Sequence, residues 1–376
     1  MFSDVYRLAS SRPVQELDFA FLVHPRDVRD IHRRLPFLKS TPQWCTTWTT
    51  RHLWPIRVAP ITGLELPSGE LLRGAVIAAA TPADLMMQDR ELALRRILQA
   101  ARLAKLYGAR YVGLGALTAS LSRGGVDVHE QLDLHVATGR MYTVLNISQI
   151  VESIVREAGV DRASVRVAVV GAAGSIGAGV SQLLASYGYR QMTLVDLAHK
   201  QDQVVSVQQE VSVIDPACRC TITDSFDVLR EQMIVVTATN HPDALILDDM
   251  LSPGSCVVDD AQPSDVAESL FTAPDKLVLE GGVVQSRNIR VPFPMGLQNR
   301  YDIFSCMAEL LLMTRHDMGQ VSPLGRSLVL DFDLIRDLST KAAEMGLQHG
   351  AFQNQQKLYS KDDVSRVLTL LRQRIV

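Results

Sequence analysis

Three glycines spaced three residues apart predict a phosphate-binding turn in this chain. They lie in the run Gly171-Ala172-Ala173-Gly174-Ser175-Ile176-Gly177. The first glycine permits a tight turn out of a strand, the second lets the backbone approach a pyrophosphate, and the third lets a helix pack against the sheet. N–H groups at a helix N-terminus favour an anion. We therefore expect a dinucleotide to bind along the whole run, including Ala173, Ser175 and Ile176.

The segments around this turn predict a strand–turn–helix–strand unit. Val165–Val170 is rich in β-branched residues, and Ala178–Tyr187 reads as a helix that ends at Gly188. A second strand, Met192–Val195, leads into Asp196, which lies 19 residues after the last glycine. An acid at that place accepts hydrogen bonds from the adenosine ribose hydroxyls. The alternative is a tight turn in an enzyme that binds no cofactor.

Two further strands end in loops that we expect to lie over the cofactor. Ile234–Thr237 runs into Ala238 and Thr239, and Lys276–Val284 contains Gly281 and Gly282. In sheets of this kind, such loops gather at the carboxyl ends of the strands. The two glycines would let the backbone pass close to a nicotinamide, although they could equally form a bulge.

Cysteine and hydroxyl side chains supply the candidate catalytic groups. Cys306 falls in the first turns of a helix that Asp302 can cap, where helix N–H groups stabilise a thiolate; packing as a small hydrophobe is the alternative. Thr118 and Ser120 follow a short strand and could bind a substrate carbonyl, or only satisfy their own turn. Thr138 is a candidate substrate-binding residue, and the alternative is that it only caps the helix expected over 141–158.

The N-terminal third has α/β character of its own. Strands are expected at 17–23, 57–61 and 71–78, the last two as a hairpin, and one long helix capped by Asp84 reaches Tyr107. We expect an α/β fold with a Rossmann dinucleotide-binding domain and a smaller N-terminal α/β domain completed by C-terminal helices. The expected division is an N-terminal substrate and catalytic domain at 1–150, the NAD(P)-binding domain at 151–290, and helices at 291–376 that pack back on the first domain.

Composition excludes several other classes of protein. The chain has 376 residues, 47% of them hydrophobic, and a net charge of −3, which gives no reason to expect nucleic-acid binding. We expect no transmembrane segment, no signal peptide and a cytoplasmic protein. Five scattered cysteines predict reduced thiols and no metal site. A final amphipathic helix at 361–374 predicts a packing element or a homo-oligomer contact.

In order, several stretches resemble the long-chain acyl-[acyl-carrier-protein] reductases of the cyanobacterial type. The resemblance runs from about Ile61 to His349 and includes Ala101–Gly108, Gly113–Ser120, Thr138-Gly139, Ala168–Gly177, Val258-Asp259, Gly281–Val284 and Phe304–Glu309. It implies that an acyl thioester, on acyl carrier protein or coenzyme A, is reduced with NADPH to a fatty aldehyde. It also implies that Cys306 is the acyl-accepting nucleophile.

Two positions depart from that pattern. Asp196 stands where the family carries a basic residue, and a carboxylate repels a 2′-phosphate, so the sequence favours NADH, with Lys200 the nearby cation that would favour NADPH. Arg140 replaces the usual Asn and would prefer a substrate carboxylate or phosphate. An amino-, imino- or hydroxy-acid dehydrogenase without a covalent intermediate, with Arg140 holding the carboxylate, is therefore one alternative. A dinucleotide-binding protein without turnover is another.

Overall fold

The computed structural model describes residues 2–34, 40–41, 43–241, 243–261, 263–293 and 295–375. The chain divides into two compact units. The first unit comprises Met1–Gly139, Arg287–Met295 and Cys306–Arg326, and the second comprises Arg140–Ser286, Gly296–Ser305 and Ser327–Val376. This division differs from the expected one, because the chain crosses between the units several times and its last helices belong to the second unit.

The first unit is built on a five-stranded sheet in the order β2-β3-β1-β4-β5. The strands are β1 (Phe19–Val23), β2 (Ile56–Ile61), β3 (Gly74–Ala78), β4 (Tyr111–Leu114) and β5 (His135–Ala137). β2 and β3 form the expected antiparallel hairpin pair, and the other pairs are parallel. Its helices are α1 (Phe2–Ser10), α2 (Val28–Arg34), α3 (Gln43–His52), α4 (Ala83–Gln88), α5 (Arg90–Leu106), α6 (Leu117–Ser120) and α7 (Val126–Leu132). A core of buried aliphatic side chains joins α5 to the sheet.

Two expectations for the first unit need correction. The helix α3 precedes β2, and no helix was expected between the strands predicted at 17–23 and 57–61 other than the one after His24. The long helix expected from Asp84 is two helices, because Asp89 separates α4 from α5. Asp89 Oδ1 accepts a hydrogen bond from the Leu92 N–H at 3.0 Å and so caps α5.

The second unit contains a six-stranded parallel sheet in the order β11-β10-β9-β6-β7-β8. Its strands are β6 (Arg166–Val170), β7 (Gln191–Val195), β8 (Arg219–Thr223), β9 (Ile234–Thr237), β10 (Cys256–Asp259) and β11 (Leu277–Glu280). Counted along the chain, this is the order 3-2-1-4-5-6 of dinucleotide-binding sheets, with the switch point between β6 and β9. The expected α/β fold class with a Rossmann domain is confirmed.

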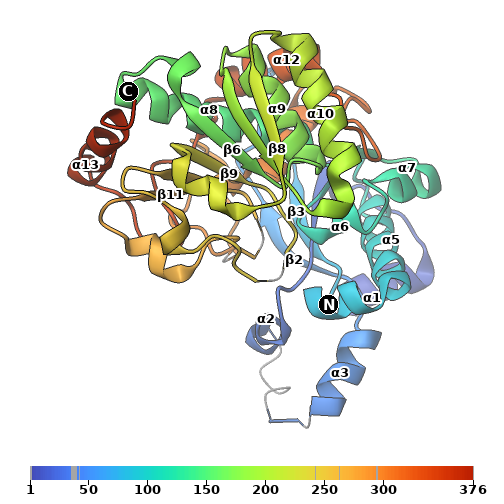
Figure 1. The fold of residues 1–376 in the computed structure, drawn as a ribbon. Coiled ribbons are helices and arrows are strands. Elements are labelled where there is room, and N and C mark those ends of the chain that lie inside the picture. Colours follow the sequence, from blue (N-terminus) through green and yellow to red (C-terminus); the bar gives the residue numbers. More distant parts are fainter. Residues whose placement is uncertain are drawn as a thin grey trace. The chain divides into compact units, whose positions relative to one another are not determined.

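Helices and a small sheet complete the second unit. α9 (Ser175–Ser186) packs against both α8 (Arg140–Ala158) and α10 (Gln201–Ile214), as Figure 1 shows. Short 3₁₀ turns replace long helices between β9, β10 and β11. β12 (Val283–Gln285) pairs with β13 (Asp302–Phe304) and β14 (Gln348–His349). The expected helix cap at Asp302 is wrong, because Asp302 begins β13 and its carboxylate accepts hydrogen bonds from Gln353 and Asn299.

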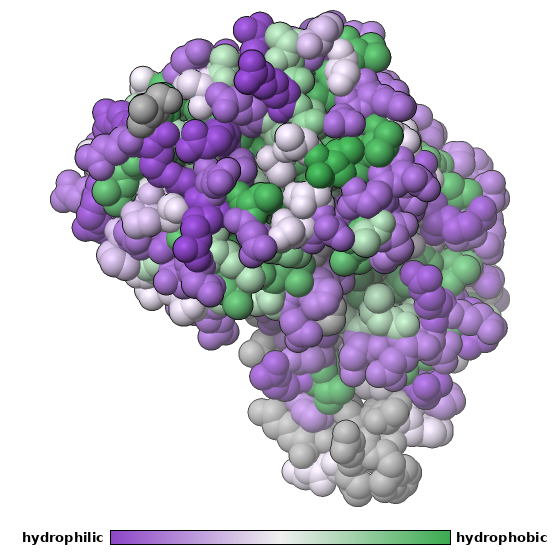
Figure 2. Space-filling model, in the orientation of Figure 1, coloured by the Kyte–Doolittle hydropathy of each residue, from purple (hydrophilic) through white to green (hydrophobic). Residues whose placement is uncertain are grey.

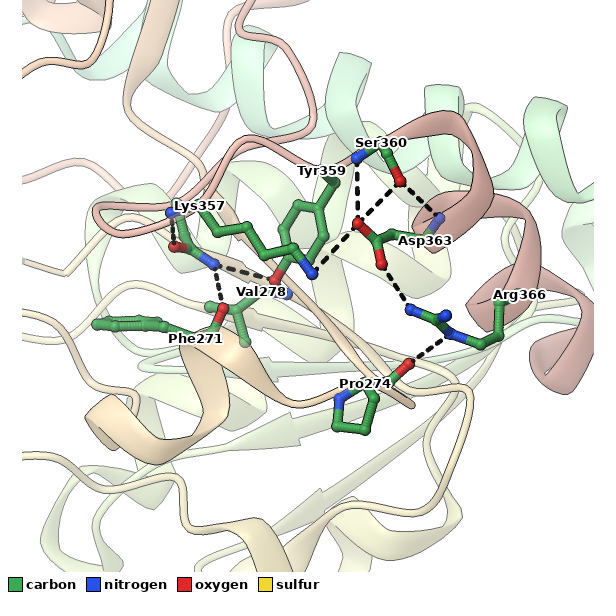
Figure 3. Close-up of polar contacts among 9 residues, drawn as sticks. Phe271, Pro274, Val278, Lys357, Tyr359, Ser360, Asp363 and Arg366 are labelled. Atoms are coloured by element: carbon green, nitrogen blue, oxygen red, sulfur yellow. Dashed lines mark hydrogen bonds and ion pairs between the residues drawn. The ribbon is translucent and has the colours of Figure 1, made fainter.

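The C-terminal segment covers the β11 edge of this sheet. α12 (Phe332–Met345) and α13 (Lys361–Arg372) follow β13 and α11 (Ser305–Arg315) in the chain. The Tyr359 hydroxyl accepts hydrogen bonds from the Val278 N–H of β11 at 3.1 Å and from Asn354 Nδ2 at 2.9 Å. Figure 3 shows Tyr359 pointing toward Val278. Ser360 and Asp363 form a capping box that begins α13. Tyr359, which directly precedes the cap of α13, therefore supplies a hydrogen-bond partner to the edge strand β11.

The surface is polar over most of the face seen in Figure 2, where apolar residues are interspersed among hydrophilic ones. Within the described ranges, every helix is too short or too polar to cross a bilayer.

Candidate functional site

The glycine turn adopts the tight geometry expected of a phosphate-binding loop. Gly171 follows β6 with a φ of +83°, a conformation that side-chain-bearing residues rarely adopt. A Cβ atom at Gly177 would lie 2.4 Å from the Gly171 carbonyl oxygen, so α9 begins directly on the turn. Between these two glycines lie Ala173, Gly174, Ser175 and Ile176. A backbone this close to a helix N-terminus offers N–H groups to an anion.

Asp196 follows β7 and touches the glycine turn directly. Its side chain is almost fully buried, and Oδ2 accepts a hydrogen bond from the Ala173 N–H at 2.8 Å. Oδ1 accepts from the Leu197 N–H at 2.8 Å and forms an ion pair with Lys200 Nζ at 3.3 Å. A carboxylate offers about four lone-pair positions. Asp196 therefore positions the turn and retains capacity to accept a ribose hydroxyl.

The loop after β9 lies against the other side of the same turn. A Cβ atom at Gly171 would lie 2.6 Å from the Ala238 carbonyl oxygen. Thr239 Oγ1 donates to Asp265 Oδ1 at 2.6 Å, and Asp265 is fully buried. The structure thus brings Ala238 and Thr239 beside Gly171 at the switch point, and their contact with a cofactor stays a prediction.

Three carboxyl groups gather at the carboxyl ends of β10 and β11. Asp259 and Glu280 are directly paired in the parallel register, and Asp260 follows Asp259. Burial raises the pKa of Asp259 to about 6, against hydrogen bonds from Ser264 and Thr237 that lower it. Burial, with the charge of Asp259, raises the pKa of Asp260 to about 8 and that of Glu280 to about 7. Near neutral pH this edge therefore carries exchangeable protons.

Gly281 and Gly282 form the turn that follows these acids. The Gly281 N–H donates to the Asp259 carbonyl at 2.7 Å, and the Gly282 carbonyl accepts from the Ser305 N–H at 2.8 Å. A Cβ atom at Gly282 would lie 2.9 Å from Asp260 Oδ1. Glycine at position 282 therefore leaves room beside the Asp260 carboxylate.

Cys306 lies in the first unit, beside the loop that ends β5. It is the second residue of α11, and a Cβ atom at Gly139 would lie 2.2 Å from the Cys306 Cβ. The buried carboxylate of Glu309, one helical turn further on, accepts hydrogen bonds from the Gly139 N–H at 3.0 Å and from Ser322 Oγ at 2.7 Å. Thr138 bonds the same serine through its N–H and its Oγ1, each at 3.1 Å. A buried network thus holds residues 138–139 against the cysteine helix.

The remaining predicted residues make contacts with the backbone. Thr118 Oγ1 donates to the Gly115 carbonyl at 2.7 Å, and Ser120 Oγ donates to the Leu117 carbonyl at 3.1 Å. Arg140 begins α8 in the second unit, where it is buried and its Nη1 donates to the Ser327 carbonyl at 3.2 Å. The structure therefore gathers the predicted residues into two groups, one in each unit.

Sequence reasoning missed Glu309, Asp260 and Asn146. Glu309 ends the motif Phe304–Glu309, and Asp260 directly follows the motif Val258-Asp259. Neighbouring motifs in the sequence could therefore have pointed to both residues. Asn146 had no such signal, because its partners lie about a third of the chain away. Among the described residues, no group of three or more His, Cys, Asp or Glu side chains could hold a metal ion.

Comparisons with known proteins contradict one expectation. No family model matches the chain. A curated relative, the aminotransferase PigE of Serratia sp. (strain ATCC 39006), is 25% identical over 338 residues, which cover 84% of this chain and 38% of that protein. The chain thus spans well under half the length of this relative.

Similar solved structures include a putative malic enzyme (12% identity, TM-score 0.44, covering 99% of this chain and 88% of that one). They also include L-tryptophan dehydrogenase from Nostoc punctiforme (12%, TM-score 0.38, covering 96% and 89%). A third is quinate dehydrogenase from Corynebacterium glutamicum in complex with NAD (11%, TM-score 0.36, covering 86% and 99%). The curated relative is named an aminotransferase and not an acyl-[acyl-carrier-protein] reductase, so the expected membership of that reductase family is wrong.

Proposed function

We propose that this chain is an NAD(P)-dependent dehydrogenase that acts on a small amino, imino or hydroxy acid by direct hydride transfer. One observation carries the proposal: the glycine turn at 171–177 begins α9 at the switch point between β6 and β9, with the Asp196 carboxylate bonded to its backbone. Ligands of open parallel sheets bind at this point.

The residues around the turn fit a dinucleotide. Backbone N–H groups at 175–177, in the first turn of α9, would hold the pyrophosphate, and Asp196 would hold the adenosine ribose. Its carboxylate favours NADH over NADPH because it repels a 2′-phosphate, and the Lys200 ammonium at 3.3 Å partly offsets that repulsion. When bound, the nicotinamide would supply the hydride acceptor or donor.

Arg140 is the candidate for holding the substrate carboxylate. Its guanidinium is buried at the start of α8, and one of its nitrogens bonds the Ser327 carbonyl. A planar guanidinium can bind a carboxylate through two parallel hydrogen bonds, which fixes the orientation of the acid. An Arg140→Lys variant keeps the charge but loses that geometry, so we expect a higher KM for the acid and unchanged dinucleotide affinity.

A second candidate function is reduction of an acyl thioester through Cys306. The observation that favours it is the partly exposed Cys306 in the first turn of α11, held against Gly139. The thiolate would attack the thioester carbon of an acyl-coenzyme A or acyl carrier protein, and the carrier thiol would leave. Hydride addition to the acyl-enzyme and expulsion of the thiolate would then free an aldehyde. Thr118 and Ser120 remain the proposed oxyanion donors.

One experiment separates the two candidates and a binding protein without turnover. The wild-type chain and Cys306→Ala are mixed with a panel of 2-amino and 2-hydroxy acids plus NAD⁺ or NADP⁺, and hydride transfer is followed at the absorbance of the reduced nicotinamide. We expect turnover of an acid with equal rates in both proteins. In parallel, intact-protein mass spectrometry follows incubation with acyl thioesters. An acyl adduct that is lost in Cys306→Ala and on addition of NADH would refute the dehydrogenase and support the thioester reductase.

A further inference from the structure

Asn146 on α8 carries a buried hydrogen-bond acceptor that has no donor. The residue is fully buried, and its Nδ2 donates to the Gly281 carbonyl at 2.6 Å and to the Val283 carbonyl at 3.1 Å. Its Oδ1 meets no donor among the described residues. Leaving a buried amide oxygen unsatisfied costs free energy, and the great majority of such atoms have a partner. Asn146 thus bonds the turn at 281–283 through its amide nitrogen, and its amide oxygen is left as an acceptor that a ligand N–H could satisfy.

Asp260 reaches the same turn from the end of β10. Its Oδ1 lies 2.9 Å from the position that a Cβ atom would take at Gly282. Within the described part of the chain, the Asp260 carboxylate has neither a hydrogen bond nor an ion pair. It is only partly exposed, so water compensates its charge incompletely. When it is deprotonated, the Asp260 carboxylate therefore attracts a cation.

The place of the turn in the sheet indicates which part of a dinucleotide would meet these two groups. A sheet of this order consists of two mononucleotide-binding halves. Asp196 follows β7 in the half formed by β6, β7 and β8, which takes the adenosine. Asp260 and Gly281–Gly282 follow β10 and β11 in the other half. The second base of a nicotinamide dinucleotide has a carboxamide N–H, and its ring is cationic when oxidised and neutral when reduced.

We propose that Asn146 Oδ1 accepts the carboxamide N–H of the nicotinamide and that the Asp260 carboxylate faces its ring and discriminates the oxidised from the reduced form. This inference rests on the proposed dinucleotide-binding function. Deprotonated Asp260 attracts the cationic ring of NAD⁺, whereas the neutral ring of NADH gains nothing from that charge. The buried acceptor Asn146 Oδ1 matches the carboxamide N–H, and the Asp260 anion matches the positive charge of the oxidised ring.

Among the described residues, the charged group that acts on Asp260 is itself an acid. It is Asp259, the last residue of β10, whose negative charge raises the pKa of Asp260. The negative charges of Asp259 and of Asp302 on β13 raise the pKa of Glu280 on β11. The charge of Asp265 in turn raises the pKa of Asp259. The described α8 side chains that reach the turn, Asn146 and Ile147, are uncharged, as is Ser305.

The pH dependence of binding follows from these charges. Burial places the pKa of Asp260 at about 8, so much of the carboxyl is protonated at neutral pH. Binding of the cationic ring favours the deprotonated form and lowers that pKa, which releases a proton. We therefore expect the ratio of the NADH Kd to the NAD⁺ Kd to rise about tenfold from about pH 6 to about pH 9, the change that one pKa unit produces.

Calorimetry on the wild-type protein tests the charge role without any substitution. NAD⁺ and NADH are titrated at about pH 8 in two buffers with different ionisation enthalpies, which reports the protons released on binding. We expect proton release with NAD⁺ and little or none with NADH. Equal proton release with both forms would overturn the inference, although the dinucleotide-binding function would stand. If neither the NAD nor the NADP pair binds, the proposed function itself fails.

Substitutions assign the effect to the two residues. Asp260→Asn should abolish the pH dependence of the Kd ratio, whereas Asp249→Asn, which removes an exposed charge from the same unit, should leave it unchanged. The acetylpyridine analogue of NAD⁺ has a methyl ketone in place of the carboxamide. We expect wild type to bind it about tenfold more weakly than NAD⁺, because Asn146 Oδ1 then lacks its donor. Asn146→Ala should bind both equally; an unchanged preference in that variant would refute the role of Asn146.

Discussion

Asp260→Asn should make the second unit more stable at alkaline pH. The pKa of this carboxyl rises from 3.8 to about 8 on folding, mainly through burial. The folded chain then binds more protons than the unfolded chain between these pH values, so the stability of wild type falls as the pH rises through them. Asn has nearly the same shape and no charge to desolvate, and it removes this contribution.

The expected size of the effect follows from the pKa difference. Four pKa units at about 1.4 kcal/mol each set an upper limit of about 6 kcal/mol. Partial exposure of Asp260 to water reduces this value, and we expect Asp260→Asn to be about 2 kcal/mol more stable than wild type at about pH 9. At about pH 4 the two proteins should be nearly equal, because the Asp260 carboxyl is then uncharged in the folded state. The unfolding free energy of the variant still falls with rising pH, because Asp259 and Glu280 also have raised pKa values.

Hydrogen exchange detected by mass spectrometry is the suitable assay. The three tryptophans, at positions 44, 48 and 54, all belong to the first unit, so their fluorescence does not report on β10. Exchange protection in peptides covering β9, β10 and β11 gives the opening free energy of the relevant sheet across pH. Curves for wild type and variant that run parallel from about pH 4 to about pH 9 would refute the reasoning about the Asp260 charge.

Three further substitutions test the packing around the site. Tyr359→Phe leaves the buried N–H of Val278 without its acceptor and should cost about 1–3 kcal/mol in urea unfolding followed by circular dichroism. Glu309→Ala should cost a similar amount because the Gly139 N–H loses its acceptor, and Glu309→Gln, which keeps an oxygen there, should recover most of it. Gly177→Ala places a Cβ atom 2.4 Å from a backbone oxygen and should weaken NADH binding more than tenfold in a fluorescence titration.

Each of these substitutions has a control. Ser186→Ala lies on the exposed side of α9 and should leave NADH affinity unchanged, so an equal loss in both variants would point to the helix as a whole. Lys357→Ala removes a cation near Asp363 but leaves the Tyr359 hydroxyl in place. If it destabilises the chain as much as Tyr359→Phe, the lost acceptor of Val278 is not the cause.

Much of the Rossmann domain could be predicted because its signals are local. β6, the glycine turn, α9 and Asp196 follow one another within about thirty residues, and each depends on its own residue types. The expected cap at Asp302 failed for a physical reason. An aspartate before an apolar run is typical of a helix start, but here tertiary pairing with β12 draws Asp302 into a strand. Family resemblance failed too, since motifs shared by many dinucleotide-binding chains do not identify the chemistry.

The sequence by itself determined the fold class, the glycine turn and the position of Cys306 at the start of a helix, because contiguous residues specify turns, caps and strands. Only the tertiary structure decided which distant groups meet. Glu309 bonds Gly139 across 170 residues, and Asn146 bonds Gly281 across 135. Such contacts depend on how packed elements bury one another's side chains, and no spacing along the chain encodes them. The unpaired Oδ1 of Asn146 and the unpaired carboxylate of Asp260 therefore emerge only once α8, β10 and β11 are placed together.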